Sequence, residues 1–325
     1  MSESGDYDPG PWGGYDFKSA RKSYDAHVGR SYSDAVRTGK DLDEMLEKKV
    51  STKSTSPLVI ACDVTGSMGD WPATMFSKLP YLENEGKEYL GKDMEICFAA
   101  IGDAYSDKYP LQVRPFTKGK DLEKRMKELV IEGGGGGQTS ESYDLAALYF
   151  ANNADMPNAI KPILIFIGDE GLYEHVDKQQ AKNIIGINFE ERLSTKQLFE
   201  QLKTKYSVYL VRKPYENTGR DGMSSTDQRI YKQWEELLGA ENISILPEPG
   251  RVVDVIFGIL AKETNRIDYF RDELTGRQKP DQVKTVLKAL ETIHCIEGAP
   301  DRKKLKAGMS VTRNAGGGKP TKSLV

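Results

Sequence analysis

The chain has 325 residues, of which 38% are hydrophobic, so it is long enough to bury a core in one large domain or two modest ones. Its 46 basic and 49 acidic residues leave a net charge of −3, which argues against a nucleic-acid or membrane partner. The three cysteines lack metal-site spacing and favour reduced thiols over a disulfide framework. No stretch is long and apolar enough to span a bilayer, and the N-terminus lacks the apolar core of a signal peptide. We therefore expect a cytoplasmic protein.

Residues 1–55 differ in composition from the rest of the chain. The segment Pro9–Tyr15 is rich in glycine and proline and cannot form a regular element. After it, apolar side chains recur at four-residue steps and predict amphipathic helices of low hydrophobicity, at Tyr24, Val28, Tyr32 and Val36. We interpret residues 1–55 as an N-terminal extension that packs on the main domain. A docking arm for a partner is the alternative.

Residues 56–262 alternate between strands and helices. Strands are expected at 58–62, 94–101, 111–116, 161–167, 206–211 and 243–246. Helices are expected at 71–90, with a break near Pro80, and at 121–130, 143–153, 193–203, 227–238 and 252–262. This alternation predicts an α/β fold with three layers, a doubly wound and mostly parallel central sheet covered by helices on both faces. The short link before 111–116, together with Pro115, predicts one antiparallel strand at the edge of the sheet.

Residues 263–325 form the third predicted region. One helix is expected at 281–294, followed by a tail that carries seven Lys and Arg residues and no Asp or Glu from Arg302 to Val325. Such a composition is typical of a flexible, solvated end. We favour that interpretation over a nucleic-acid contact.

Oxygen-bearing side chains follow the predicted strands at the points where those strands end. Asp63, Thr65 and Ser67 follow the first strand at steps of two residues, and Asp169 follows strand 161–167. Thr139 comes after five glycines in the loop that precedes a predicted helix. Ligands of open α/β sheets bind at the carboxyl ends of the strands. Hard oxygen ligands suit Mg²⁺, or alternatively Mn²⁺ or Ca²⁺, better than zinc.

The order of these groups resembles the metal-ion-dependent adhesion site of von Willebrand factor type A domains, in their intracellular, bacterial and phage-like branch. That motif reads Asp-x-Ser-x-Ser, then a Thr on a second loop and an Asp on a third. Asp63, Thr65, Ser67 and Asp169 match it, and Thr65 keeps the hydroxyl of the serine it replaces. The resemblance covers residues 57–262 and implies that these four side chains bind the metal.

The second loop departs from the family pattern. Thr139 is matched to the family's threonine, but Gln138 and Glu141 compete with it for that role. Glu170, next to a predicted ligand, is a further candidate. The five glycines allow close backbone approach, but the Gly-Lys-Ser/Thr ending of a phosphate loop is absent.

The resemblance implies binding rather than catalysis. Family members use an open position on the metal to bind a carboxylate of a partner, and intracellular ones often work beside AAA+ ATPases. We therefore expect a Mg²⁺-dependent protein-binding adaptor with no catalytic residues and no organic cofactor, since no nucleophile with a positioned base is evident. The alternatives are a metal-dependent phosphotransferase or hydrolase that uses Asp63, and a metal-free scaffold.

Overall fold

The structure is a computed structural model that describes residues 42–69, 71–131, 139–215 and 223–293. The predicted helices of the N-terminal extension and the basic tail lie outside these ranges, as do the glycine run and Gln138. Among the described helices, none is long and apolar enough to cross a membrane.

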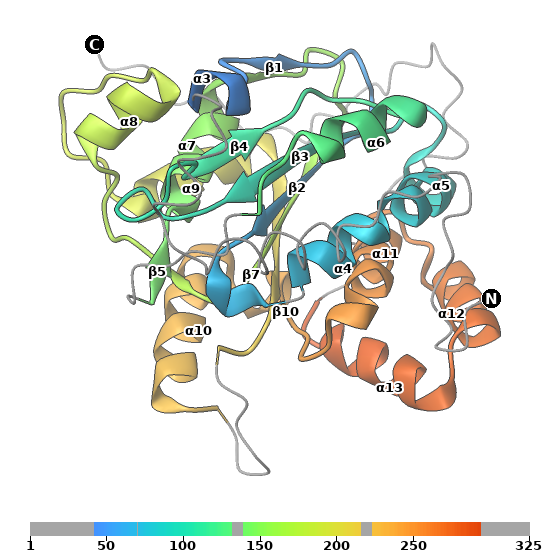
Figure 1. Ribbon diagram of the computed structural model, residues 1–325. Helices are drawn as coiled ribbons and strands as arrows, with labels where there is room; N and C mark the ends of the chain where they lie inside the picture. Colours follow the sequence, from blue (N-terminus) through green and yellow to red (C-terminus); the bar gives the residue numbers. More distant parts are fainter. Residues whose placement is uncertain (1–41, 70, 132–138, 216–222, 294–325) are drawn as a thin grey trace, which may run out of the picture.

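A six-stranded sheet forms the centre of the molecule (Figure 1). Its strand order is β10-β9-β7-β2-β3-β4, and all neighbours are parallel except β3 and β4. The predicted antiparallel edge strand is therefore confirmed. The strands are β2 (Pro57–Asp63), β3 (Glu95–Ile101), β4 (Leu111–Val113), β7 (Ile163–Gly168), β9 (Ser207–Arg212) and β10 (Ile243–Ile245).

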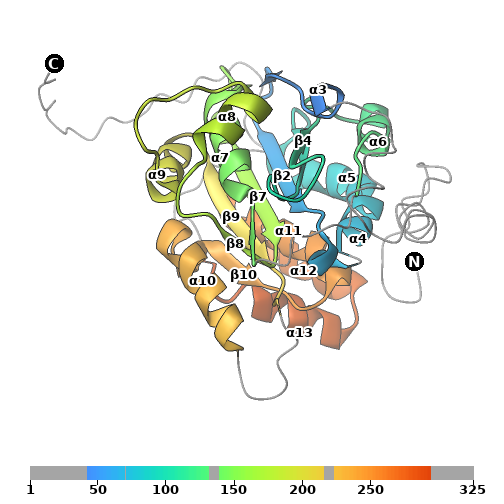
Figure 2. The same cartoon turned by 60° about the vertical axis from the view of Figure 1, so that its left-hand side comes forward.

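Helices cover both faces of this sheet, as Figures 1 and 2 show, and the predicted three-layer α/β fold is confirmed. The core on one face receives side chains from α4 (Trp71–Ser77), α5 (Leu79–Leu90), α6 (Lys120–Lys127), α11 (Val252–Glu263), α12 (Ile267–Arg277) and α13 (Pro280–Ala289). The core on the other face receives them from α7 (Tyr143–Asn152), α8 (Lys178–Ile185), α9 (Thr195–Lys205) and α10 (Ser225–Leu238).

Strand β2 shows why the central strands are continuous apolar runs. Leu58, Ile60 and Cys62 enter the first core, whereas Val59 and Ala61 enter the second. A strand buried on both faces needs apolar side chains at every position. On the neighbouring strand β3, Cys97 enters the second core, and both thiols are free and buried.

Short elements complete the fold. The helix α3 (Leu42–Met45) precedes β1 (Val50–Ser51), which pairs with β6 (Ala154–Asp155), and β5 (Ser140–Glu141) pairs with β8 (Gly171–Leu172). A single turn of 3-10 helix, η3 (Gly66–Met68), follows β2, and η4 (Ala240–Asn242) and η5 (Pro249–Arg251) precede β10 and α11.

Two helices, α8 and α12, are not predicted from the sequence. Each buries only two side chains, Ala181 and Ile185 in α8 and Phe270 and Leu274 in α12. An apolar stripe this short does not establish a helical period. The predicted break near Pro80 does occur, because α4 ends at Ser77 and Pro80 lies in the first turn of α5, where no backbone N–H is needed.

Candidate metal centre

The loop after β2 gathers the first three predicted ligands. Asp63, the last residue of β2, is fully buried. Its Oδ1 accepts hydrogen bonds from the Thr65 backbone N–H at 2.8 Å and from the Thr65 hydroxyl at 2.6 Å. The Thr65 and Ser67 hydroxyls lie 3.2 Å apart. Steps of two residues therefore place three oxygen-bearing groups next to one another.

Asp169 joins this loop from the next strand. Strands β2 and β7 pair in parallel, with Cys62 opposite Ile167, so their carboxyl ends lie side by side. The Ser67 hydroxyl donates to Asp169 Oδ1 at 3.0 Å. One hydrogen-bonded chain thus runs from Asp63 through Thr65 and Ser67 to Asp169, and the structure brings together four of the predicted ligands.

Tyr143, which the sequence pattern does not single out, supports Asp63 from the second face of the sheet. It is the first residue of α7, and its hydroxyl donates to Asp63 Oδ2 at 2.7 Å. Gly168 makes this contact sterically feasible, because a Cβ at that position would lie 1.7 Å from the Tyr143 oxygen. The Tyr143 ring also packs edge-on against Trp234 of α10, with ring centres 5.1 Å apart.

Lys213 is a site residue that sequence reasoning missed. Its Nζ donates to Asp169 Oδ2 at 2.6 Å and to the Ser67 carbonyl at 3.0 Å. Gly168 and Arg212 are partners in the β7–β9 pairing, so the residues that follow them, Asp169 and Lys213, emerge side by side. The signal was available, because Lys213 comes just after a predicted strand.

The second loop contributes differently from what the resemblance implies. The Thr139 hydroxyl accepts a hydrogen bond from Arg229 of α10, and no hydrogen bond of the described residues links it to Asp63 or Asp169. The other two candidates, Glu141 and Glu170, are more deeply buried than Thr139, with 2% and 4% of their surface exposed. One side-chain oxygen of each, Oε2, is buried without a hydrogen-bond partner in the described structure.

Burial and mutual repulsion raise the pKa values of these carboxyl groups. Burial, with the charge of Asp169 second, raises the pKa of Asp63 to about 7. Burial and the charge of Asp63 raise the pKa of Glu170 to about 8 and that of Glu141 to about 12. The pKa of Asp169 is also raised by burial, although the charge of Lys213 opposes the shift. Negative charge is therefore poorly compensated here.

The described residues fit a divalent cation. No three Asp, Glu, His or Cys side chains among them are grouped closely enough to hold an ion by themselves. An ion would need the hydroxyls of Thr65 and Ser67 besides Asp63 and Asp169, and Mg²⁺ accepts such a set of oxygen ligands together with water. Oε2 of Glu141 and Oε2 of Glu170, which are buried without a hydrogen-bond partner in the described structure, are further oxygens close to these groups.

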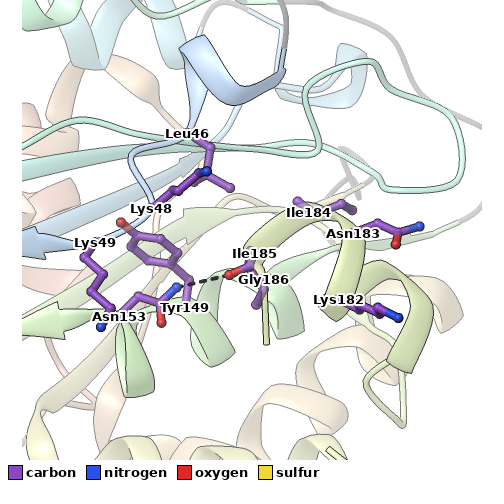
Figure 3. Close-up of a pocket in the computed structure, with 10 residues that line it drawn as sticks. All are labelled: Leu46, Lys48, Lys49, Tyr149, Asn153, Lys182, Asn183, Ile184, Ile185 and Gly186. Atoms are coloured by element: carbon purple, nitrogen blue, oxygen red, sulfur yellow. Dashed lines mark hydrogen bonds between the residues drawn. The ribbon is translucent and has the colours of Figure 1, made fainter. Parts of the chain in front are cut away.

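A separate pocket of about 380 Å³ lies near the opposite end of α7 (Figure 3). Among the described residues, its lining includes Tyr149, Ile185 and three lysines, and no acidic side chain. Figure 3 shows Lys49 and Lys182 on opposite sides of Tyr149 and Ile185, so these ammonium groups do not converge on one point. We assign no ligand to it.

Comparisons with known proteins leave the family of the chain open. No family model matches it. Over 195 residues it is 24% identical to the sulfite reductase [NADPH] flavoprotein alpha-component of Aliivibrio fischeri, which covers 57% of this chain and 32% of that protein. The chain therefore spans about a third of the length of that curated protein.

Solved structures give similarly partial matches. The pilus adhesin SpaC from Lactobacillus rhamnosus GG, in its open conformation, matches with a TM-score of 0.47 and 12% identity over 70% of this chain and 31% of its own. Proximal thread matrix protein 1 of the mussel byssus matches with a TM-score of 0.41 and 12% identity over 66% of this chain and 48% of its own.

Proposed function

We propose that the protein binds a partner protein through a divalent cation, Mg²⁺ in the first place, held at the carboxyl ends of β2 and β7. The observation that carries the proposal is the continuous chain of oxygens from Asp63 through Thr65 and Ser67 to Asp169. Two strands distant in sequence contribute to it, which a simple turn or helix cap after β2 does not require.

The chemistry of the site favours recognition over bond breaking. Thr65 and Ser67 contribute dipoles without charge, so a cation held here keeps an affinity for one further anionic ligand, and it would supply electrostatic attraction for a partner's carboxylate. The two hydroxyls are already engaged in hydrogen bonds with aspartates and with each other. Within the described ranges, neither is paired with a histidine or lysine side chain that would act as its base, so we propose an adaptor and not an enzyme.

The proposal includes a cytoplasmic location and a partner of the AAA+ ATPase class. The location is supported by Cys62 and Cys97, which are free and buried. The partner class rests on the resemblance to intracellular type A domains.

Isothermal titration with Mg²⁺ or Mn²⁺ tests the metal-binding part of the proposal. We expect saturable binding by the native protein and none by Asp63→Ala. Asp272→Ala, which removes an exposed carboxylate of α12, is the matched control and should bind as the native protein does. Equal binding by native protein and Asp63→Ala would contradict the proposal.

Partner capture tests the remaining part. The partner should be released by excess chelator, and Asp169→Ala should reproduce that release without chelator. Full retention under chelator would place the interface elsewhere.

A metal-free scaffold is the competing function, and the Lys213 ammonium beside Asp169 is the observation that favours it.

A further inference from the structure

Lys213 supplies the positive charge at the candidate metal centre, which is the group formed by Asp63, Thr65, Ser67 and Asp169. Among the described residues, it is the only lysine or arginine that forms an ion pair with Asp63, Glu141, Asp169 or Glu170. Its side chain is 18% exposed, whereas that of Asp169 is fully buried. The ammonium thus lies where a buried carboxylate meets solvent.

The contacts of Lys213 are those of a cation at a coordination site. Its Nζ lies 2.6 Å from Asp169 Oδ2 and 3.0 Å from the Ser67 carbonyl. The other oxygen of Asp169 accepts from the Ser67 hydroxyl. Lys213 therefore binds the carboxylate of Asp169, in the loop after β7, and the backbone carbonyl of Ser67, in the loop after β2.

A metal ion on Asp169 would meet this ammonium at short range. An ion bound directly to Oδ2 at the Mg²⁺–oxygen distance would lie no more than about 4.7 Å from Nζ in its present position. Like charges at that separation repel strongly in a partly buried site. The Lys213 stem, with its four rotatable carbons, can carry the ammonium outward into solvent.

We propose that Lys213 is a tethered counter-ion of the centre, which occupies Asp169 and Ser67 when no metal is bound and must leave them when a divalent cation binds. Lys213 consequently sets the affinity of the site for the cation. This inference rests on the proposed metal-binding function and states how that site is regulated. It also reconciles the two functions above, because the metal-free scaffold becomes the resting state of the adaptor.

The test compares cation binding by matched variants. Lys213→Gln removes the charge but keeps a polar side chain with N–H donors. Lys284→Gln removes the same charge from an exposed position on α13. In titrations with Mg²⁺ or Mn²⁺, we expect Lys213→Gln to bind about tenfold more tightly than the native protein. Lys284→Gln should match the native protein, and Lys213→Gln combined with Asp63→Ala should not bind.

Two outcomes overturn the inference, and they can be told apart. Asp63-dependent binding that is equal or weaker in Lys213→Gln would reject the counter-ion role while leaving the metal site intact. No binding by either the native protein or Lys213→Gln would reject the metal site itself.

Thermal unfolding gives a second readout that requires no partner. In chelator, Lys213→Gln should melt at a lower temperature than Lys284→Gln, because the carboxyl cluster has lost its counter-ion. Added Mg²⁺ should raise the melting temperature of Lys213→Gln by more than that of the native protein. An equal shift in both would contradict the exchange of Lys213 for metal. If Lys213→Gln folds only when Mg²⁺ or Mn²⁺ is present, while Lys284→Gln folds in chelator, that dependence is the expected result in its strongest form.

Discussion

At the scale of single residues, the candidate metal centre depends on a close approach between helix α7 and the sheet. Tyr143 reaches Asp63 from α7 only across the backbone of Gly168, where a side chain would collide with the tyrosine oxygen. The glycine, the tyrosine and the aspartate therefore act together, although they come from three elements.

The first prediction concerns Gly168→Ala. The added methyl must displace Tyr143, so we expect the free energy of unfolding to fall by about 1–3 kcal/mol. We also expect Asp63 to lose the hydrogen bond that it accepts from Tyr143. Urea unfolding measures the first effect. Gly276→Ala in α12 is the control, because no atom of the described residues lies within 4 Å of a Cβ there. Equal stability of the two variants would contradict the close approach.

The second prediction concerns Asp144, whose side chain is buried in the first turn of α7. Burial raises its pKa from 3.8 to about 7, the backbone N–H groups of Asp144 and Leu145 oppose the shift, and the charges of Asp103 and Asp177 add to it. A carboxyl group whose pKa is higher in the folded state stabilises the fold below its unfolded pKa and loses that contribution as the pH rises through the folded value.

Stability measured from pH 4 to pH 8 should therefore fall more steeply in the native protein than in Asp144→Asn. Urea unfolding across this range gives both slopes. The exposed Asp272→Asn should follow the native slope. An unchanged slope in Asp144→Asn would show that Asp144 does not titrate as its burial requires.

At the scale of elements, helix α10 fixes the loops that carry the site. The Trp234 indole N–H donates to the Glu170 carbonyl at 2.9 Å, and Arg229 reaches Thr139. Asp227, in the first turn of α10, pairs with Arg212, the neighbour of Lys213, and both side chains are 1% exposed. The position of Lys213 is therefore tied to α10 through a buried ion pair.

The third prediction follows from this pair. Asp227→Ala leaves the Arg212 guanidinium buried without its partner and also frees the Tyr215 backbone N–H, which now donates to Asp227 at 2.8 Å. We expect a loss of about 3–5 kcal/mol in the free energy of unfolding. Asp268→Ala, an exposed acidic residue in the first turn of α12, should change stability little. Comparable losses in the two variants would refute the role of the pair.

The elements also show how far the sequence predicts the site. Asp63, Thr65, Ser67 and Asp169 were predictable, because each follows an apolar run whose end can be located from the sequence. Lys213 follows such a run equally well, but a basic residue is not expected in a metal motif. Tyr143 was not predictable, since its contact depends on how α7 packs on the sheet and on the missing side chain of Gly168.

At the scale of the whole molecule, the last two described helices share the core of the sheet. Phe270 and Leu274 of α12 and Val286 of α13 belong to the same buried cluster as α11. Leu290 packs directly on the backbone of α11, since a Cβ at Gly258 would lie 2.1 Å from its Cδ1. The boundary predicted after residue 262 marks the end of the strand–helix alternation in the sequence. The packing contacts of α12, α13 and Leu290 extend across it.

The fourth prediction tests that boundary. A chain ending at Glu263 loses the buried side chains of Phe270, Leu274, Val286 and Leu290, each contributing about 1.5–3 kcal/mol, which together is comparable to the total stability of a typical domain. We expect this chain to be unfolded by circular dichroism and proteolysis. A chain ending at Ile293 keeps these contacts and is the control. A folded, cooperative chain ending at Glu263 would contradict the prediction and show that folding does not need residues 264–293.

The alkylation rates of the two described thiols report local opening on the two sides of the sheet separately. Cys62 and Cys97 sit on adjacent strands but in opposite cores, and burial raises the pKa of each thiol. An alkylating reagent can modify either one only while its own layer is open. Because Cys62 immediately precedes Asp63, its labelling rate reports the opening of the sheet beside the centre, and Cys97 supplies the reference from the other layer. If Mg²⁺ slows the labelling of Cys62 more than that of Cys97, its stabilising effect lies on the Cys62 side of the sheet. This comparison requires no mutation.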